Sequence, residues 1–239
     1  GAGSNTLIRD AGFEGVIIKL GSKFSSVNLL NKETIEVGAA TLDRKVSDFA
    51  KNNCISRMEF LSCIPGSIGG AITMNSGCYG TEISEILLSI IVVDNLGQEK
   101  ELSKKEINFF YRGSDLPKNH IIISAKLKGE IASKELIEKK QQELIERKKN
   151  SQPSKIKTGG STFKNLSDKK AWMLIKESGC HKFKVGDAKI SEKHCNFFVN
   201  DGNAKASDIE TLINKVKTEV QKKTGIKLEL EIKIIGDEK

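Results

Sequence analysis

The chain has 239 residues, of which 39 are basic and 31 acidic, so its formal net charge is +8. This length allows one large domain or two modest ones, and a hydrophobic content of 38% excludes a globally disordered chain. No apolar run approaches the roughly 20 residues of a membrane-spanning helix, so we expect no membrane partner.

The basic residues are poorly suited to reading nucleic acid. Only Arg9, Arg44, Arg57, Arg112 and Arg147 are arginines, and the lysines stand among glutamates, as in "KELIEKKQQELIERKK". Arginine is the residue that usually recognises bases and phosphates with two hydrogen bonds. We therefore expect no nucleic acid and favour a phosphorylated small molecule as the partner.

The cysteines indicate a reducing compartment. They are five in number and include no C-x-x-C pair, which is typical of free thiols in a cytoplasmic protein. Cys180-His181 and His194-Cys195 lack the ligand spacing of a zinc site, so no metal is expected.

The N-terminal half predicts a strand-rich region. β-Branched runs bounded by turn residues predict strands over 15–21, 34–40, 89–102 and 120–131. The third should fold into a hairpin at Asn95-Leu96-Gly97. Residues 41–53 predict an amphipathic helix with Thr41 as its N-cap and with an apolar face made of Leu42, Val46, Phe49 and Ala50.

The C-terminal half begins with a long charged helix over 133–150, whose apolar stripe consists of Leu136, Ile137, Leu144 and Ile145. Pro153 follows in a turn-rich stretch that suggests a domain boundary. Helices are predicted over 170–179 and 205–225, and strands over 194–201 and 226–236. The second helix should start with a Ser207–Glu210 capping box and end at Gly225.

Two glycine-rich stretches could hold an anion through backbone N–H groups. "GAGSN" opens the chain, and "CIPGSIGGAITMNSGCYG" spans 63–80, with a turn at Pro65-Gly66 and room for close approach at Gly69-Gly70. A plain bend between two elements remains the alternative. The chain has neither a G-x-G-x-x-G after a strand nor a P-loop, which disfavours both of those nucleotide sites.

Three further stretches contain candidate catalytic side chains. In "FFYRGSD", Arg112 is either a structural ion pair or a stabiliser of negative charge. Alternation in "LELEIKIIG" sends Glu229, Glu231 and Lys233 to the face opposite the leucines and isoleucines, where solvent exposure is the simpler explanation. In "TGGSTFKN", Ser161 is either a loop residue or a serine held out on a tight turn.

Together, "GAGSNTL", "IPGSIGGAITMNSGCYGTE", "YRGSD", "QPS…GGSTFKN", "GDAKISEKHCNFFVN" and "LELEI…G" resemble, in order and spacing, the motifs of the UDP-N-acetylenolpyruvoylglucosamine reductase family. The chain is similar to the family's shorter form. The resemblance implies an α+β fold: a vanillyl-alcohol-oxidase-type FAD-binding domain over 1–132 without its first lobe, a connecting helix over 133–152, and a smaller α+β substrate domain over 153–239.

The resemblance also implies a cytoplasmic, monomeric flavoenzyme of bacterial peptidoglycan precursor synthesis. It would use NADPH and FAD to reduce UDP-N-acetylglucosamine enolpyruvate to UDP-N-acetylmuramate. The FAD-binding residues implied by the motif matches are Gly1, Ala2, Gly3, Ser4, Asn5, Thr6, Ile64, Pro65, Gly66, Ser67, Gly69, Gly70, Asn75, Gly77 and Gly80.

By the same resemblance, Ser161 donates a proton to substrate carbon, while Arg112 and a protonated Glu231 polarise the substrate carboxylate. The implied substrate-binding residues are Lys164, Asn165, His194 and Lys233. His194 could equally be a packed core histidine. Leu166 stands where relatives have proline, which leaves the turn after Asn165 less fixed.

Two alternatives remain. One is another flavoprotein oxidase or dehydrogenase of the same superfamily, for which Cys63 or Cys78 would be the candidates for covalent flavin attachment. The other is a non-catalytic binding module.

Overall fold

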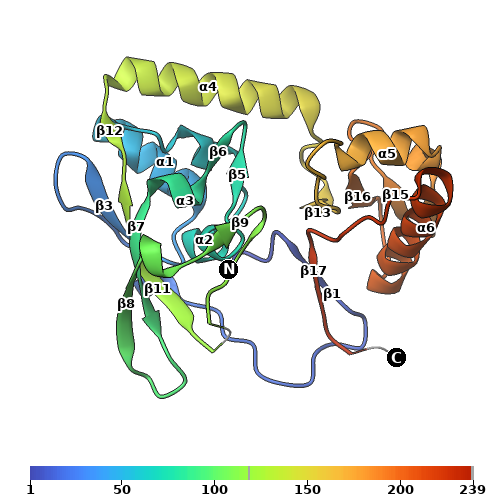
Figure 1. Cartoon of the computed structure of the whole chain (residues 1–239), viewed down its shortest axis with the longest axis horizontal. Helices are drawn as coiled ribbons and strands as arrows, with labels where there is room; N and C mark the ends of the chain where they lie inside the picture. The colour runs from blue at the N-terminus through green and yellow to red at the C-terminus, as the bar shows by residue number, and fades with distance from the viewer. Residues whose placement is uncertain (118, 238–239) are drawn as a thin grey trace. The chain divides into compact units, whose positions relative to one another are not determined.

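The computed structural model describes residues 1–117 and 119–237, and Figure 1 shows their helices and strands. They form two compact units. The N-terminal unit comprises Gly1–Ala2 and Ile18–Lys148, and the C-terminal unit comprises Gly3–Ile17 and Lys149–Lys239.

These units divide the chain differently from the predicted domains. Gly3–Ile17 packs within the C-terminal unit because β1 (Thr6–Ile8) pairs in parallel with β17 (Lys233–Ile235). Most of the helix predicted as a connector belongs to the N-terminal unit. Pairing between chain ends is a long-range event that local sequence does not encode.

A five-stranded antiparallel sheet forms the centre of the N-terminal unit. Its order is β2 (Val27–Leu29), β3 (Thr34–Gly38), β11 (Ile121–Lys128), β7 (Leu87–Val93) and β8 (Glu99–Ser103). The strands predicted over 34–40, 89–102 and 120–131 are confirmed. The β7–β8 turn contains Gly97 at φ +80°, and the Asp94 carboxylate accepts the N–H groups of Leu96 and Gln98.

Helices and short hairpins complete this unit. They are η1 (Ser22–Phe24), α1 (Asp43–Asn52), η2 (Glu59–Cys63), α2 (Ile68–Thr73), α3 (Ile83–Ile86), η3 (Lys104–Glu106) and the paired strands β4 (Ile55–Ser56) with β12 (Glu130–Ile131), β5 (Gly77–Cys78) with β6 (Thr81–Glu82), and β9 (Phe109–Phe110) with β10 (Gly113–Ser114).

The strand predicted over 15–21 is wrong. Its residues form no strand, and Val16 is 87% exposed. The β-branched pattern was genuine, but a strand also needs a partner edge, which the pattern does not supply.

The helix predicted over 41–53 is confirmed as α1, but its cap is not. Leu42 is the N-cap and is half exposed, while the Thr41 hydroxyl donates to the carbonyl of Ser26. Val46 and Ala50 are buried as predicted.

The long helix α4 (Lys134–Ser151) begins as predicted, with the N–H of Leu136 donating to Ser133 Oγ. Its buried face is narrower than predicted: Ile137 is buried and Leu144 packs on the core, whereas Leu136 and Ile145 are exposed. Gln141 shares that face and donates to Ser47 Oγ at 2.7 Å. The 3.6-residue period selects positions 137, 141 and 144.

The C-terminal unit is built on a four-stranded antiparallel sheet. Its order is β13 (Lys157–Ser161), β16 (Phe197–Asn200), β15 (Ala188–Ile190) and β14 (Lys184–Val185). With it pack α5 (Ala171–Glu177), η4 (Cys180–Lys182) and α6 (Ala206–Thr224). Phe163 is completely buried in the core of this unit, and its ring packs edge-on against that of Phe198 with the ring centroids 5.7 Å apart.

The start of α6 differs from the prediction. Its N-cap is Lys205, and the predicted Ser207–Glu210 box does not form. Instead, Asp10 accepts the N–H groups of Ala206 and Ser207 at 2.8 and 2.9 Å, and Glu210 pairs with Arg9 at 2.9 Å. The end at Gly225, with φ +74°, is confirmed.

The last predicted strand is only partly regular. Its alternation is confirmed, because Leu228 and Ile232 are buried while Glu229 and Lys233 are exposed. Regular pairing is confined to β17, preceded by an isolated bridge between Phe163 and Leu230. Among the described residues, no helix is long and apolar enough to cross a membrane.

Candidate active site

Ser161 ends β13 at an irregular point of the sheet. The pairing of β13 with β16 slips between Thr158 and Ser161, where Gly160 adopts φ +83°. The hydroxyl of Thr158 donates to the carbonyl of Phe198 at 2.7 Å and fixes the strand on one side of the irregularity. A β-bulge re-aims the side chain that follows it, and Ser161 is half-buried.

Glu231 lies on the neighbouring segment. Its N–H donates to the carbonyl of Thr162 at 2.9 Å, and its own carbonyl accepts the amide of Asn5. Thr162, the residue after Ser161, is therefore hydrogen-bonded to Glu231 through the backbone. The predicted pair Ser161 and Glu231 occupies adjacent segments of the C-terminal unit, with Glu231 half-buried.

The segment after Ser161 is held rigidly without a proline. The side chain of Asn196 accepts the N–H of Phe163 and donates to its carbonyl, and Asn165 Oδ1 accepts the N–H of Ala171 at the start of α5. The N–H of Leu166 donates to Lys169 at 2.9 Å, a bond that proline lacks, and the Leu166 side chain packs on the core.

Of the other predicted substrate contacts, Lys164 pairs with Glu229 at 3.7 Å, and Lys233 is exposed on β17. Glu229 therefore has a local electrostatic partner on the same face as Glu231.

His194 borders a cavity of about 820 Å³ within the C-terminal unit. The Nδ1 of His194 accepts the N–H of Asn196, its ring lies edge-on to Trp172 and Phe197, and burial lowers its pKa, so it is neutral with its proton on Nε2. Other lining residues are Lys176, His181, Lys182, Lys184, Lys189, Glu192 and Lys193. Five lysines around an aromatic wall suit an anionic, ring-bearing ligand.

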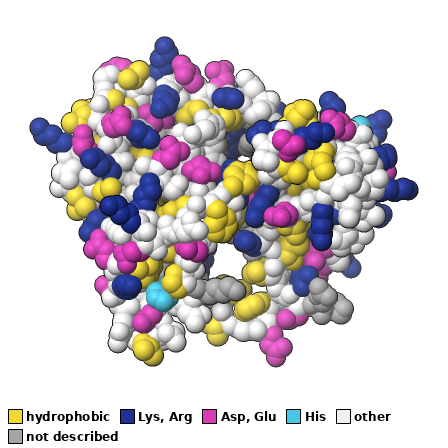
Figure 2. Space-filling view, viewed as in Figure 1, with side chains coloured by type: hydrophobic (Ala, Val, Ile, Leu, Met, Phe, Trp, Pro, Cys, Tyr) yellow, Lys and Arg dark blue, Asp and Glu magenta, His cyan; other side chains and the backbone are white. Residues whose placement is uncertain are grey.

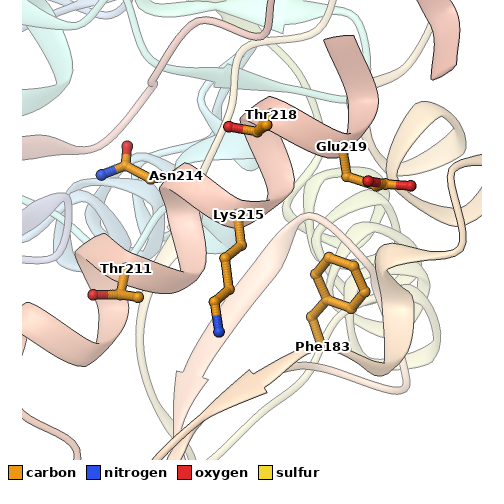
Figure 3. A pocket seen from close by; sticks show the side chains of 6 residues that line it. All are labelled: Phe183, Thr211, Asn214, Lys215, Thr218 and Glu219. Atoms are coloured by element: carbon orange, nitrogen blue, oxygen red, sulfur yellow. The ribbon is translucent and has the colours of Figure 1, made fainter. Parts of the chain in front are cut away.

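A second hollow, of about 550 Å³, lies on the surface of α6 (Figure 3). Five of its six labelled side chains come from successive turns of the helix, namely Thr211, Asn214, Lys215, Thr218 and Glu219, and the sixth, Phe183, comes from outside it. It has one lysine and one glutamate and lacks the charge concentration of the larger cavity.

The glycine-rich stretch after η2 surrounds a buried hydroxyl. Ser67 is 3% exposed, precedes α2, and its Oγ has no hydrogen-bond partner among the described residues. A Cβ on Gly1 would lie 3.2 Å from that oxygen, and a Cβ on Gly69 would lie 3.1 Å from the Cβ of Ala39. The N–H of Ile68 and that of Gly69 donate to the carbonyls of Thr41 and Ala39, which fixes the turn.

The rest of the first motif belongs to the C-terminal unit. Gly3, at φ +74°, accepts the N–H of Thr6, and the carbonyl of Asn5 accepts the N–H of Lys233. This places Gly3–Thr6 beside the strand that follows Glu231.

Arg112 occupies the turn of the β9–β10 hairpin, at φ +56°. Its Nη2 donates to the carbonyl of Gly77 at 3.0 Å, its Nη1 lies 3.6 Å from Glu82 Oε1, and its guanidinium stacks over Tyr111. Glu82, which the sequence reasoning did not single out, thus positions Arg112. Its only signal was its place at the end of the glycine-rich motif.

Asn75, predicted to contact a cofactor, is 2% exposed and is bonded internally. Its amide donates to Glu82 Oε2 at 2.7 Å and to the carbonyl of Phe110, and its oxygen accepts the N–H of Ser84. Gly80, at φ +91°, follows Tyr79 at φ +54°, which forms the two-residue turn between β5 and β6. Asn75 and this hairpin therefore support the Glu82–Arg112 pair.

No group of three or more potential metal ligands occurs among the described residues. On the face that Figure 2 shows, lysine and arginine side chains are interspersed with acidic ones.

The two halves of the sequence match different family models. Residues 1–103 match the FAD binding domain, and residues 152–235 match the C-terminal domain of UDP-N-acetylenolpyruvoylglucosamine reductase. The α+β fold class and the presence of a FAD-binding domain are confirmed.

Individual relatives agree along nearly the whole chain. UDP-N-acetylenolpyruvoylglucosamine reductase of Pelagibacter ubique (strain HTCC1062) is 51% identical over 98% of this chain and 79% of its own length, and that of Wolbachia pipientis wMel is 45% identical over 99% and 80%. The crystal structure of the reductase from Thermus caldophilus has a TM-score of 0.87 and 34% identity, covering 98% of this chain and 83% of its own. The chain therefore belongs to the UDP-N-acetylenolpyruvoylglucosamine reductase family.

Proposed function

We propose that this chain, an FAD-dependent oxidoreductase, reduces UDP-N-acetylglucosamine enolpyruvate to UDP-N-acetylmuramate with NADPH, and that Ser161, Arg112 and Glu231 carry the chemistry at the substrate. The observation that carries the proposal is the pairing of the Ser161 bulge with the Glu231 segment, inside a domain of the reductase family.

The residues of the N-terminal unit fit FAD. Ser67 has a buried hydroxyl without a partner among the described residues, and a Cβ on the neighbouring Gly1 would crowd that oxygen at 3.2 Å. These are features of a turn that receives a phosphate oxygen. Ser67, Gly1 and the turn at Pro65-Gly66 would hold the pyrophosphate, and the bound flavin supplies the hydride-transfer chemistry.

Arg112 and Glu231 would act on the substrate carboxylate. Addition of hydride to the vinyl carbon leaves negative charge on the carbon that bears this carboxylate, so a preorganised cation and a protonated acid lower the barrier. Arg112 is held for this by Gly77 and Glu82. The resulting carbanion must then be protonated. Ser161, which follows the irregularity in β13, would donate this proton.

The lysine-lined cavity supports a nucleotide-linked substrate. Its cationic rim would attract a diphosphate, and Trp172 with His194 offers aromatic surface for a base or sugar. Lys164, Asn165 and Lys233 would contribute further contacts on the Ser161 side of the unit.

A UDP-sugar substrate and five free thiols favour the cytoplasm. We predict that the chain is a monomer and has no nucleic-acid or membrane partner. Sedimentation at several protein concentrations tests the oligomeric state.

Product analysis tests the proposed function. The purified chain, loaded with FAD, should consume NADPH beyond one equivalent per flavin only when the enolpyruvyl sugar nucleotide is present, and mass spectrometry should find a product heavier by two hydrogens. Consumption of NADPH that is coupled to oxygen and indifferent to the sugar nucleotide would instead indicate a flavoprotein oxidase. No consumption by FAD-loaded protein would indicate a binding module.

A further inference from the structure

Two cysteines meet where the predicted cofactor turn joins the hairpin that supports Arg112. Cys63 ends η2 and is followed directly by Ile64–Ser67. Cys78 ends β5, next to Gly77, whose carbonyl accepts Arg112. The mechanism proposed above uses neither thiol.

Cys78 packs against the turn that carries Cys63. The Cys78 thiol donates to the carbonyl of Phe60 at 3.4 Å, within the same η2 turn that ends at Cys63, and each cysteine lies close enough to shift the pKa of the other. Ser62 Oγ lies 3.8 Å from the sulfur of Cys63. Both cysteines are free thiols; Cys63 is 5% exposed and Cys78 is half-buried.

We propose that Cys63 and Cys78 form a redox-active pair that a hydroperoxide closes into a disulfide, and that this closure weakens FAD binding at the adjoining turn. The second part rests on the proposed function, because it assumes that Ile64–Ser67 holds the cofactor.

The chemistry balances with hydrogen peroxide as the oxidant. The Cys63 thiolate attacks one peroxide oxygen, the O–O bond breaks, and hydroxide leaves Cys63 as a sulfenic acid. The Cys78 sulfur then attacks the sulfenic sulfur, the S–O bond breaks, and the thiol proton leaves with the oxygen as water. Two thiols have lost two electrons and two protons, and the peroxide has become two molecules of water. A dithiol reductant reverses the closure.

The environment assigns these roles. The neighbouring Cys78 thiol and, more weakly, the Ser62 hydroxyl and the charge of Lys148 lower the pKa of Cys63 to about 6, which makes it the thiolate at neutral pH. The neighbouring Cys63 and burial raise the pKa of Cys78, which therefore acts second.

Closure should disturb the cofactor turn for a geometric reason. The sulfurs of two free thiols lie farther apart than those of a disulfide, whose S–S bond is about 2.05 Å. Forming the bond must draw β5 toward η2, and the turn at Ile64–Ser67 is joined directly to η2. Gly77, whose carbonyl accepts a hydrogen bond from Arg112, belongs to β5 and would move with it.

Chemical cleavage at methionine gives a direct test, because Met74 lies between the two cysteines and Met58 precedes them. After peroxide treatment and blocking of free thiols, the fragments 59–74 and 75–173 of the native chain should stay joined until a reductant separates them. The treated protein should lose two of its five thiols. Fragments that separate without reductant would overturn the proposal.

Variants and a binding measurement complete the test. Cys54→Ser removes the exposed thiol and should leave the cross-link intact, whereas Cys78→Ser should yield only a trappable sulfenic acid at Cys63. Equilibrium dialysis should show that the Kd for FAD rises several-fold on oxidation and returns with dithiothreitol, in the native chain but not in Cys78→Ser. An unchanged Kd in fully cross-linked protein would refute the effect on FAD, independently of whether the enzyme reduces its proposed substrate.

Discussion

Ser161 and Glu231 owe their positions mainly to backbone hydrogen bonds, through the β13 bulge and the Thr162–Glu231 bond. The motif "GGSTFKN" and the alternation of "LELEIKIIG" were enough to nominate both residues. Neither pattern could reveal that the two segments are neighbours, because 70 residues separate them in the sequence.

Ser161→Ala separates a chemical role from a structural one. Loss of the hydroxyl should slow reoxidation of reduced flavin by substrate by about 10²–10⁴-fold, the usual contribution of a positioned acid, and leave flavin reduction by NADPH unchanged. Stopped-flow absorbance measures the two steps separately. Equal losses in both would make the serine a structural residue, and Ser167→Ala on the exposed turn beyond is the matched control.

Glu231→Gln and Glu229→Gln test which carboxyl group acts. Glu231 is half-buried and its N–H donates to the carbonyl of Thr162, whereas the Glu229 side chain is 77% exposed and pairs with Lys164. We expect Glu231→Gln to slow the substrate step by about 10²–10³-fold and Glu229→Gln to slow it much less. The reverse order would move the catalytic assignment by two residues.

Arg112 shows the limit of reading a residue alone. The sequence left it between an ion pair and a stabiliser of charge, and the structure shows the ion pair with Glu82 and the bond to Gly77. These partners come from another hairpin, so no local pattern could identify them.

At the scale of elements, local signals predicted most helices and strands but not their caps. The left-handed glycine at the end of α6, Gly225, is a local signal and was predicted. Its start depends on Asp10, almost 200 residues away, and the 15–21 run lacked the partner edge that a strand needs.

Asp10→Asn should weaken α6. Backbone N–H groups of Ser207 and Ala206 hold the pKa of Asp10 below 3.8, so its contribution to stability is present above that value and is lost as the pH falls through the lower folded-state pKa. The variant should melt below the native chain at pH 7, and the gap should close in strong acid. A constant gap would contradict the charge-based cap; Asp168→Asn, on an exposed turn, is the control.

Asp43→Asn should have the opposite pH dependence. Burial raises the pKa of Asp43 to about 8, and neither carboxyl oxygen has a partner among the described residues. Between its ordinary value of 3.8 and about 8, the unfolded chain releases this proton while the folded chain keeps it, so stability falls with rising pH. The melting temperature of the native chain should fall by a few degrees relative to Asp43→Asn across that range.

The control for this measurement is Asp48→Asn, on the same helix but 48% exposed. If the native chain and Asp43→Asn kept a constant difference from acid to pH 8, the buried carboxyl would not be protonated in the folded state.

At the scale of the whole molecule, the chain has two cores, one around the five-stranded sheet and one around Phe163. The sequence predicted a boundary near Pro153 but missed the return of Gly3–Ile17 to the C-terminal unit, because parallel pairing of β1 with β17 joins opposite ends of the chain. The positive charge, interspersed with acidic groups on the face shown in Figure 2, concentrates instead around the lysine-lined cavity.

The central claim is that one chain carries out two half-reactions on a shared flavin, and anaerobic absorbance spectroscopy tests it most directly. NADPH should bleach the flavin band near about 450 nm, and the band should return only when UDP-N-acetylglucosamine enolpyruvate is added. The account would be contradicted if the flavin band did not return with this substrate, or if it returned equally well with UDP-N-acetylglucosamine.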